Sequence, residues 1–144
     1  MIIGTVKEIK KLEFRVGLTP DKVADYVNAG HTVLVEAGAG LGCNFQDSEY
    51  TKVGAEIVPT KEEVWAKADM IIKVKEPLPE EYPLIRENQI LYTYLHLAAD
   101  VPQAKAIRDA GAKAVAYETM VERGTLPCLI PMSQIAGSLA AQEG

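Results

Sequence analysis

The sequence predicts an α/β fold, a doubly wound and mostly parallel sheet with helices on both faces. Short β-branched or apolar runs alternate with segments of helical spacing, and at 144 residues with 48% hydrophobic composition the chain suits one substantial core. Glycine also separates helical segments from strand-like runs, as expected where helices end in a left-handed residue. The strand-like runs are residues 2–6, 32–36, 70–74, 90–95 and 113–117.

Local signals place helices between these runs. Thr19 stands before Pro20, so a hydroxyl that can cap a helix precedes a proline suited to the first helical turn. Segments 61–67 and 102–109 have similar helical spacing. The glycines that we expect to end helices are Gly30, Gly54 and Gly111.

The last segment has a different character. Ser133 precedes a stretch rich in small residues, with Ile135 and Leu139 on one side, which predicts a helix capped by Ser133. A helix this short is marginal without a packing partner. We therefore expect residues 1–131 to form one domain and residues 132–144 to begin a linker helix.

Composition excludes several classes of function. The chain has 15 basic and 20 acidic residues, a formal charge of −5, and no run of Lys or Arg suited to nucleic acid. No apolar stretch approaches the roughly 18 residues that a membrane span needs, and no signal peptide is apparent, so a cytoplasmic location is expected. Cys43 and Cys128 lie far apart, which predicts two free thiols and no metal site.

Two lysines stand in an otherwise apolar strand-like run. An unpaired ammonium is costly to bury, so Lys73 and Lys75 need either solvent or a partner. Pro77 ends the strand and places Lys75 at its carboxyl end, where such sheets bind ligands. Lys75 is therefore a better site candidate than Lys73, although two solvated lysines on an edge strand would give the same pattern.

The next strong strand ends in a histidine. Strand alternation puts Tyr92, Tyr94 and His96 on one face, with His96 near the same rim as Lys75. An imidazole, with an ordinary pKa of about 6.5, can exchange a proton near neutral pH. A structural role for His96 stays open, and His31, in a turn, is assigned no role.

Two further features have alternative interpretations. Arg15 could hold a carboxylate in two parallel hydrogen bonds, or it could be an ordinary surface arginine. The glycines Gly38, Gly40 and Gly42 follow a strand, but a dinucleotide fingerprint needs glycine where Cys43 stands. We interpret this segment as a flexible turn.

Several motifs together resemble the alanine dehydrogenase family, and the resemblance runs along the whole chain. The transhydrogenase alpha subunit is a relative of that family, but it usually lacks the Lys-Glu-Pro and Leu-His elements found here. The resemblance is carried by Glu13-Phe14-Arg15-Val16-Gly17-Leu18-Thr19-Pro20, Glu36-Ala37-Gly38-Ala39-Gly40, Lys73-Val74-Lys75-Glu76-Pro77, Tyr94-Leu95-His96-Leu97-Ala98-Ala99, Ala116-Tyr117-Glu118-Thr119 and Pro131-Met132-Ser133.

The resemblance implies reversible oxidation of L-alanine to pyruvate and ammonia, with NAD taking up the hydride and water hydrolysing the intermediate imine. It implies that Arg15 binds the substrate carboxylate, that Lys75 contacts the substrate oxygen and that His96 transfers a proton. Tyr94 and Met132 resemble pocket-wall residues.

Ser133 resembles a serine that approaches the nicotinamide and is the one cofactor-binding candidate. The main NAD-binding domain and a catalytic aspartate would lie beyond this chain, so we expect the chain alone to be inactive. Members of the family are homo-oligomers, usually hexamers. Two alternatives stay open, a stand-alone module that binds keto acids or amino acids and a transhydrogenase alpha-subunit relative.

Overall fold

A single parallel sheet organises the computed structural model, which describes residues 1–143. Its six strands follow the order β3-β2-β1-β4-β5-β6, and every pairing between neighbours is parallel. The predicted fold class is therefore confirmed. The strands are β1 (Ile2–Thr5), β2 (Thr32–Glu36), β3 (Glu56–Val58), β4 (Met70–Ile72), β5 (Ile90–Thr93) and β6 (Lys113–Ala116).

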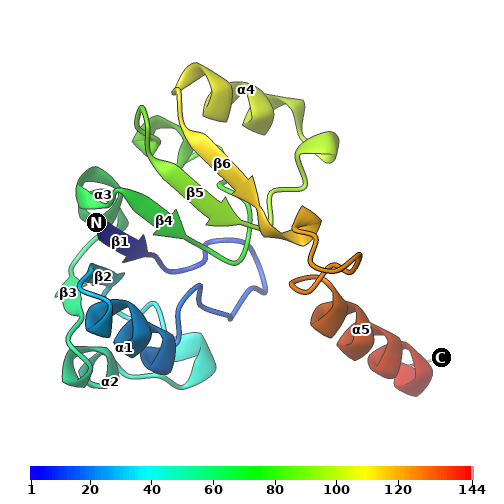
Figure 1. Ribbon diagram of the computed structural model, residues 1–144, viewed down its shortest axis with the longest axis horizontal. Coiled ribbons are helices and arrows are strands. Elements are labelled where there is room, and N and C mark those ends of the chain that lie inside the picture. Colours follow the sequence, from blue (N-terminus) through cyan, green and yellow to red (C-terminus); the bar gives the residue numbers. More distant parts are fainter. Residues whose placement is uncertain (144) are drawn as a thin grey trace.

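Helices cover both faces of the sheet (Figure 1). α1 (Pro20–Asn28) and α2 (Asp47–Lys52) pack on one face, whereas α3 (Lys61–Lys67) and α4 (Val101–Asp109) pack on the other. α5 (Ile130–Glu143) follows the last strand. Four single 3-10 turns complete the description, η1 (Leu41–Cys43), η2 (Tyr82–Leu84), η3 (Leu97–Ala99) and η4 (Tyr117–Thr119).

Two hydrophobic cores form because successive strand residues point to opposite faces. In β4, Ile71 belongs to the core under α3 and α4, whereas Ile72 belongs to the core under α1 and α2. The largest buried side chains are Trp65 in the first core and Tyr50 in the second, and both are fully buried. Each fully buried side chain of this size stabilises the fold by roughly 2 kcal/mol or more.

The lysine-containing strand is shorter than predicted and lies in the middle of the sheet. β4 ends at Ile72, not at residue 74, although the Tyr94 N–H still donates to the Val74 carbonyl over 3.3 Å. Because β4 lies between β1 and β5, the alternative of two edge-strand lysines is wrong. β3 follows Gly54, a glycine that we expect to end a helix, and is not among the predicted strand-like runs.

The helix-ending glycines are confirmed, but two predicted caps are wrong. Gly30, Gly54 and Gly111 have φ values of +84°, +95° and +70°. The Thr19 hydroxyl donates to the Asp21 side chain and accepts no backbone hydrogen bond from α1. Ser133 lies inside α5, which begins at Ile130, and its hydroxyl donates to the Leu129 carbonyl over 3.2 Å.

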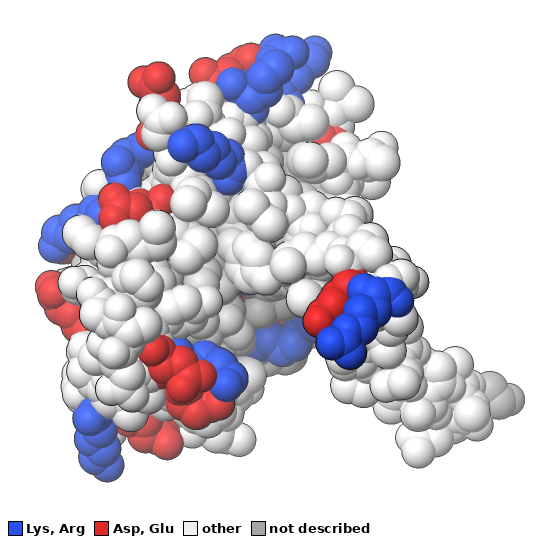
Figure 2. Space-filling model, viewed as in Figure 1, with Lys and Arg blue, Asp and Glu red and all other residues white. Residues whose placement is uncertain are grey.

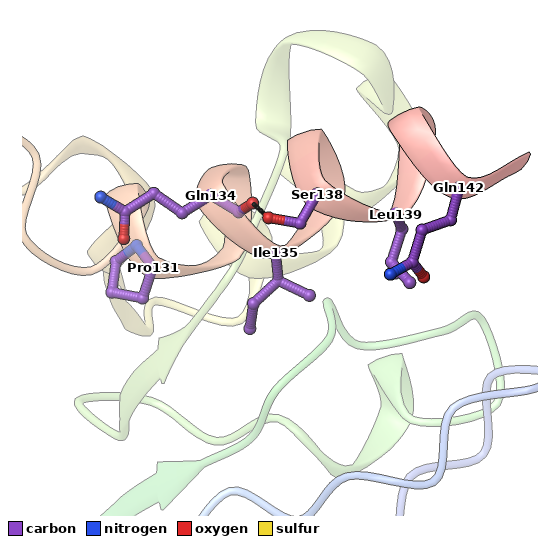
Figure 3. A pocket seen from close by; sticks show the side chains of 6 residues that line it. All are labelled: Pro131, Gln134, Ile135, Ser138, Leu139 and Gln142. Carbon is purple, nitrogen blue, oxygen red and sulfur yellow. Dashed lines mark hydrogen bonds between the residues drawn. The ribbon is translucent and has the colours of Figure 1, made fainter. Parts of the chain in front are cut away.

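The helix α5 extends away from the sheet (Figure 1) and has no buried residue. Figure 3 shows that Ile135 and Leu139 point to the same side of this helix. These two side chains are 61% and 52% exposed, as expected for an apolar stripe without a partner in the described part of the chain.

The order of the strands creates a topological switch point at the carboxyl ends of β1 and β4. The chain proceeds from β1 outward to β3 and then returns to β4 beside β1, so the loops after β1 and β4 diverge. In such sheets ligands bind at this switch point, outside the carboxyl ends of the strands. No helix in the described residues is long and apolar enough to cross a membrane.

Candidate functional site

The predicted site residues lie along the carboxyl ends of the central strands. Arg15 is in the long loop between β1 and α1, Lys75 lies just beyond β4, and His96 lies just beyond β5. Met132 is brought to the same edge by the first turn of α5. Residues far apart in the sequence therefore meet where the topology predicts a ligand site.

Arg15 is held by a neighbour that sequence reasoning did not identify. Glu13 accepts hydrogen bonds from Arg15 Nε over 2.8 Å and from Arg15 Nη2 over 2.6 Å. The remaining nitrogen, Nη1, lies 3.3 Å from the Met132 sulfur, which is a weak acceptor. One end of the guanidinium is thus fixed, while the other keeps a donor for a stronger acceptor.

The charges around this pair favour ionised side chains. The hydrogen bonds from Arg15 lower the pKa of Glu13 to about 2, and the nearby Lys75 ammonium acts in the same direction. Burial acts to raise the pKa of Glu76, but the hydrogen bond from Lys10, a backbone hydrogen bond and the charges of Lys10 and Lys75 together keep the pKa below the ordinary value. Arg15 and Lys75 therefore supply positive charge to one edge of the sheet.

Lys73 and Lys75 have different environments. Lys73 is buried, and its ammonium lies 2.6 Å from Glu81 Oε1 and 3.6 Å from Glu8 Oε2. Burial raises the pKa of Glu8, and the charge of Lys73 opposes that rise. Lys75 is half-buried and belongs to none of the ion pairs among the described residues. The preference for Lys75 as the candidate is consistent with this difference.

The backbone at Lys75 is anchored on both sides. Glu8 Oε1 accepts the Val74 N–H over 2.6 Å and approaches the Lys75 N–H at 3.3 Å. The Thr93 hydroxyl donates to the Lys75 carbonyl over 2.9 Å. The main chain is thereby fixed to both neighbouring strands, which limits the positions that the ammonium can reach.

His96 leaves the strand direction in a turn of unusual conformation. Its φ and ψ are +49° and +36°, and its imidazole stacks on the Tyr94 ring with centroids 6.3 Å apart and an interplanar angle of 15°. Strand alternation predicts that the two side chains share one face, and the stacked rings agree with that prediction. A hollow of about 460 Å³ lies beside His96 and is lined largely by small apolar residues of η3 and by η4.

Tyr94, on which His96 stacks, also contacts Cys128 and Tyr117. Its hydroxyl donates to the Cys128 carbonyl over 2.5 Å, and its ring meets the Tyr117 ring edge to face at 4.3 Å. Burial raises the pKa of Tyr94, whereas the nearby charge of Arg15 opposes the rise. Tyr94 therefore lies between Arg15 and His96, as a pocket-wall residue would.

The remaining candidates are less closely connected. Ser133 is exposed, and the one hydrogen bond of its hydroxyl among the described residues is to the Leu129 carbonyl. The glycine-rich turn is packed by the protein itself: a Cβ at Gly40 would lie 2.7 Å from the Tyr50 hydroxyl, and one at Gly42 would lie 2.3 Å from the Phe14 carbonyl. Residues 1–143 contain no group of His, Cys, Asp and Glu side chains that could bind a metal ion.

The face of the molecule drawn in Figure 2 has distinct charged and uncharged areas. Figure 2 shows an uncharged area over the carboxyl ends of β5 and β6, with charged side chains around it. Val115, Met120 and Val121 are exposed by 38%, 41% and 69%.

Comparison with known proteins identifies relatives of the whole chain. Residues 4–136 match the family described as "Alanine dehydrogenase/PNT, N-terminal domain". The chain is 54% identical to the alanine dehydrogenase of Bacillus subtilis (strain 168), over all of this chain and 38% of that protein. It is 48% identical to the alanine dehydrogenase of Mycobacterium tuberculosis (strain ATCC 25618 / H37Rv), over all of this chain and 39% of that protein.

Solved structures agree with this relationship. A structure titled "L-alanine dehydrogenase" matches all of this chain and 40% of its own length, with a TM-score of 0.95 and 49% identity. The transhydrogenase from Sinorhizobium meliloti matches 85% of this chain and 35% of its own length, with a TM-score of 0.79 and 30% identity. The chain thus spans about two fifths of the length of the curated relatives named here.

Proposed function

Because the chain belongs to the alanine dehydrogenase/PNT N-terminal domain family, we propose that it is the substrate-binding part of an L-alanine dehydrogenase. The reaction is the conversion of L-alanine, NAD⁺ and water to pyruvate, ammonium, NADH and a proton, in either direction. The observation that supports it is the meeting of Arg15, Tyr94 and Met132 at the edge that also holds Lys75 and His96. The transhydrogenase alternative is less favoured, since identity and structural similarity are both lower there.

Arg15 is proposed to anchor the substrate carboxylate. Its Nη1 faces only the Met132 sulfur, so a carboxylate oxygen would be a stronger acceptor at the same position. Glu13 keeps the guanidinium plane fixed through Nε and Nη2, which lowers the entropic cost of holding a substrate there. Met132 and Tyr94 would then form the walls beside the carboxylate.

Lys75 and His96 are proposed to act on the other end of the substrate. The Lys75 ammonium would donate a hydrogen bond to the carbonyl oxygen of pyruvate and polarise the carbon for attack by ammonia. The His96 imidazole, on an exposed turn beside Tyr94, would take up or deliver the proton that accompanies addition and loss of water. Both roles need fixed backbone positions, and both backbones are hydrogen-bonded to glutamates.

The hydride acceptor is proposed to be NAD, which supplies redox chemistry that no side chain of this chain can supply. The glycine turn does not fit a dinucleotide phosphate, because Gly40 and Gly42 are packed against Tyr50 and Phe14. Ser133 is the candidate contact to the nicotinamide, and its hydroxyl oxygen keeps acceptor capacity while donating to the Leu129 carbonyl. The dinucleotide would be bound mainly by a domain that follows α5.

The proposal includes the organisation of the complete enzyme. Residues 1–131 would be the substrate-binding domain, and residues 132–144 would begin the linker to a nucleotide-binding domain. α5 begins at Ile130, so this division falls within its first turn. The complete enzyme is proposed to be a cytoplasmic homo-oligomer, a hexamer.

Enzyme kinetics tests the proposed function. The complete enzyme is this chain followed by its nucleotide-binding part, or a chimera in which this chain replaces the matching 38% of the B. subtilis alanine dehydrogenase. We expect NADH oxidation that requires both pyruvate and ammonium, and none by the 144-residue chain alone. Absence of pyruvate-dependent turnover in the complete enzyme would contradict the proposal.

Calorimetry on the 144-residue chain separates an enzyme part from a stand-alone binding module. A binding module should bind pyruvate or alanine appreciably without cofactor, whereas half of a divided site should bind weakly. Tight binding of either acid that is lost in Arg15→Ala would favour the module. Weak binding together with turnover by the complete enzyme would favour the dehydrogenase.

A further inference from the structure

His96 has a backbone conformation that its side chain does not favour. Its φ of +49° and ψ of +36° lie in the left-handed region, which costs a residue with a Cβ roughly 1–2 kcal/mol. Such conformations persist where surrounding contacts fix them, and they concentrate at functional sites. Some group must therefore hold the turn at His96.

Glu118 is that group. Its Oε1 accepts the His96 N–H over 2.9 Å, and the Leu95 N–H lies 3.1 Å from Oε1 and 3.3 Å from Oε2. Two successive backbone donors thus converge on one carboxylate. Hydrogen bonds to an ionised acceptor are roughly twice as strong as those between neutral groups, so this contact can offset the backbone strain.

The same turn is fixed from its other side. The His96 carbonyl accepts the Ala99 N–H over 2.9 Å, and the Leu95 carbonyl accepts the side-chain amide of the buried Gln103 over 3.0 Å. The N–H groups of Leu95 and His96 are bound by Glu118, and the carbonyls of the same two residues are bound by Gln103 and Ala99. The peptide between Leu95 and His96 therefore has little freedom to rotate. Glu118 supplies the contact from η4, the turn that follows the neighbouring strand β6.

The element that carries Glu118 also reaches the neighbouring strand end. η4 follows β6, and its first residue, Tyr117, donates its hydroxyl hydrogen to the Lys73 carbonyl over 2.7 Å. Tyr117 packs edge to face on Tyr94, the ring on which His96 stacks. One short turn therefore ties together the strand ends that carry Lys75 and His96.

The same arrangement recurs at two other strand ends of this sheet. Glu8, after β1, binds the N–H groups of Val74 and Lys75 beyond β4, and Glu36, at the end of β2, binds the Lys7 N–H beyond β1 over 2.7 Å. Each carboxylate lies at or after the end of the strand adjacent to the one that it terminates. Only at His96 does the bound residue have a left-handed backbone among these three sites.

We propose that Glu118 is a positioning residue for the reaction, which orients the His96 imidazole by fixing the left-handed turn at Leu95 and His96. Glu118 acts through the backbone, so it need not touch the substrate. This inference rests on the proposed function for its catalytic consequence, but the backbone contact can be tested without activity.

Steady-state kinetics of Glu118→Ala and Glu118→Gln in the complete enzyme tests the catalytic consequence. Glu118→Ala removes both acceptors, and a misplaced acid or base reduces turnover by about a hundredfold, so kcat should fall by about that factor. KM for pyruvate should stay nearly constant because Arg15 and Lys75 are untouched. Glu118→Gln keeps an amide oxygen for the N–H groups and should restore most of kcat.

The matched control is Glu122→Gln, which removes one negative charge from an exposed residue of the following loop. It should leave kcat and KM unchanged. If Glu118→Ala is not folded, Glu118→Asp takes its place, because a shortened carboxylate cannot reach both donors and should lower kcat while keeping the charge.

Hydrogen exchange measured by mass spectrometry on the same proteins provides the readout that is independent of activity. Peptides that contain Leu95 and His96 should exchange faster in Glu118→Ala, or in Glu118→Asp if Ala is not folded, than in Glu118→Gln and Glu122→Gln. Unchanged exchange, or a kcat within about twofold of the parent despite faster exchange, overturns the positioning role. A parent enzyme without pyruvate-dependent turnover contradicts the proposed function. In that case the exchange result still shows whether Glu118 fixes the backbone at Leu95 and His96.

Discussion

Glu13 holds Arg15 by two side-chain hydrogen bonds, from Nε over 2.8 Å and from Nη2 over 2.6 Å. The Nε and Nη2 atoms are thus both occupied by Glu13, whereas Nη1 has only the weakly accepting sulfur of Met132 at 3.3 Å among the described residues. The geometry therefore divides the guanidinium into a structural end and an end that can bind a ligand. This division leads to the first two predictions.

The first prediction concerns carboxylate binding by Arg15. In Arg15→Lys, a single ammonium can pair with Glu13 but cannot also present a second nitrogen in the fixed plane of the guanidinium. We expect KM for pyruvate in the complete enzyme to rise about tenfold or more, with a smaller change in kcat. A tenfold rise is equivalent to a loss of about 1.4 kcal/mol of binding free energy. The control is Arg108→Lys at an exposed position on α4, and an unchanged KM in Arg15→Lys would reject the anchor.

The second prediction concerns stability in acid. Because Arg15 lowers the pKa of Glu13 to about 2 from an ordinary 4.5, the pair contributes stability that is fully present above pH 4.5. That contribution is lost as the pH falls from 4.5 toward 2. Urea unfolding at pH 5 and at pH 3 should therefore show a larger loss for the parent chain than for Glu13→Gln. Equal losses in the two proteins would show that the pair does not stabilise the fold.

The third prediction concerns the buried lysine. Lys73→Met would leave the carboxylates of Glu8 and Glu81 without their ammonium partner, and breaking a buried ion pair in this way costs about 3–5 kcal/mol. Lys67→Met, which breaks an exposed pair with Glu63, should change the free energy of unfolding by less than about 1 kcal/mol. Denaturant unfolding measures both. A stable but inactive Lys73→Met enzyme would instead indicate that Lys73 takes part in catalysis.

The fourth prediction concerns the glycine turn. A Cβ at Gly42 would lie 2.3 Å from the Phe14 carbonyl, so Gly42→Ala must displace the segment that carries Arg15 and should destabilise the chain by about 1–3 kcal/mol. Gly137→Ala is the matched control, since nothing lies within 4 Å of its Cβ position. Thermal unfolding compares the two. A neutral Gly42→Ala would mean that this turn does not constrain Arg15.

The sequence predicted the fold well because its signals were local. Alternating strand-like and helical runs, together with glycines that end helices, predicted the parallel sheet. Pro77 placed the end of the lysine-containing strand too late, because β4 already ends at Ile72. The topology then placed Lys75 and His96 along one edge without further information. Caps were predicted less well. The Thr19 hydroxyl is directed to the Asp21 side chain, and Ser133 is not at a helix start at all, because α5 already begins at Ile130.

The partners of the site residues could not be predicted in the same way. Glu13 and Arg15 are close in sequence, but nothing local showed that their side chains pair. Lys73 meets Glu81 only because the chain reverses through the intervening turn, and Glu118 reaches His96 only because β6 lies beside β5. Each of these contacts depends on tertiary structure, and each joins residue types that are common on protein surfaces.

The most direct test of the proposed site is the turnover of His96→Ala beside His31→Ala in the complete enzyme, measured as pyruvate- and ammonium-dependent NADH oxidation. These are the only two histidines of the chain, and His31 lies before β2 at the opposite end of the strands from His96. Loss of a proton-transfer group should lower kcat about a hundredfold or more in His96→Ala, whereas His31→Ala should keep the parent value. Equal kcat values for the two variants would contradict a catalytic role for His96.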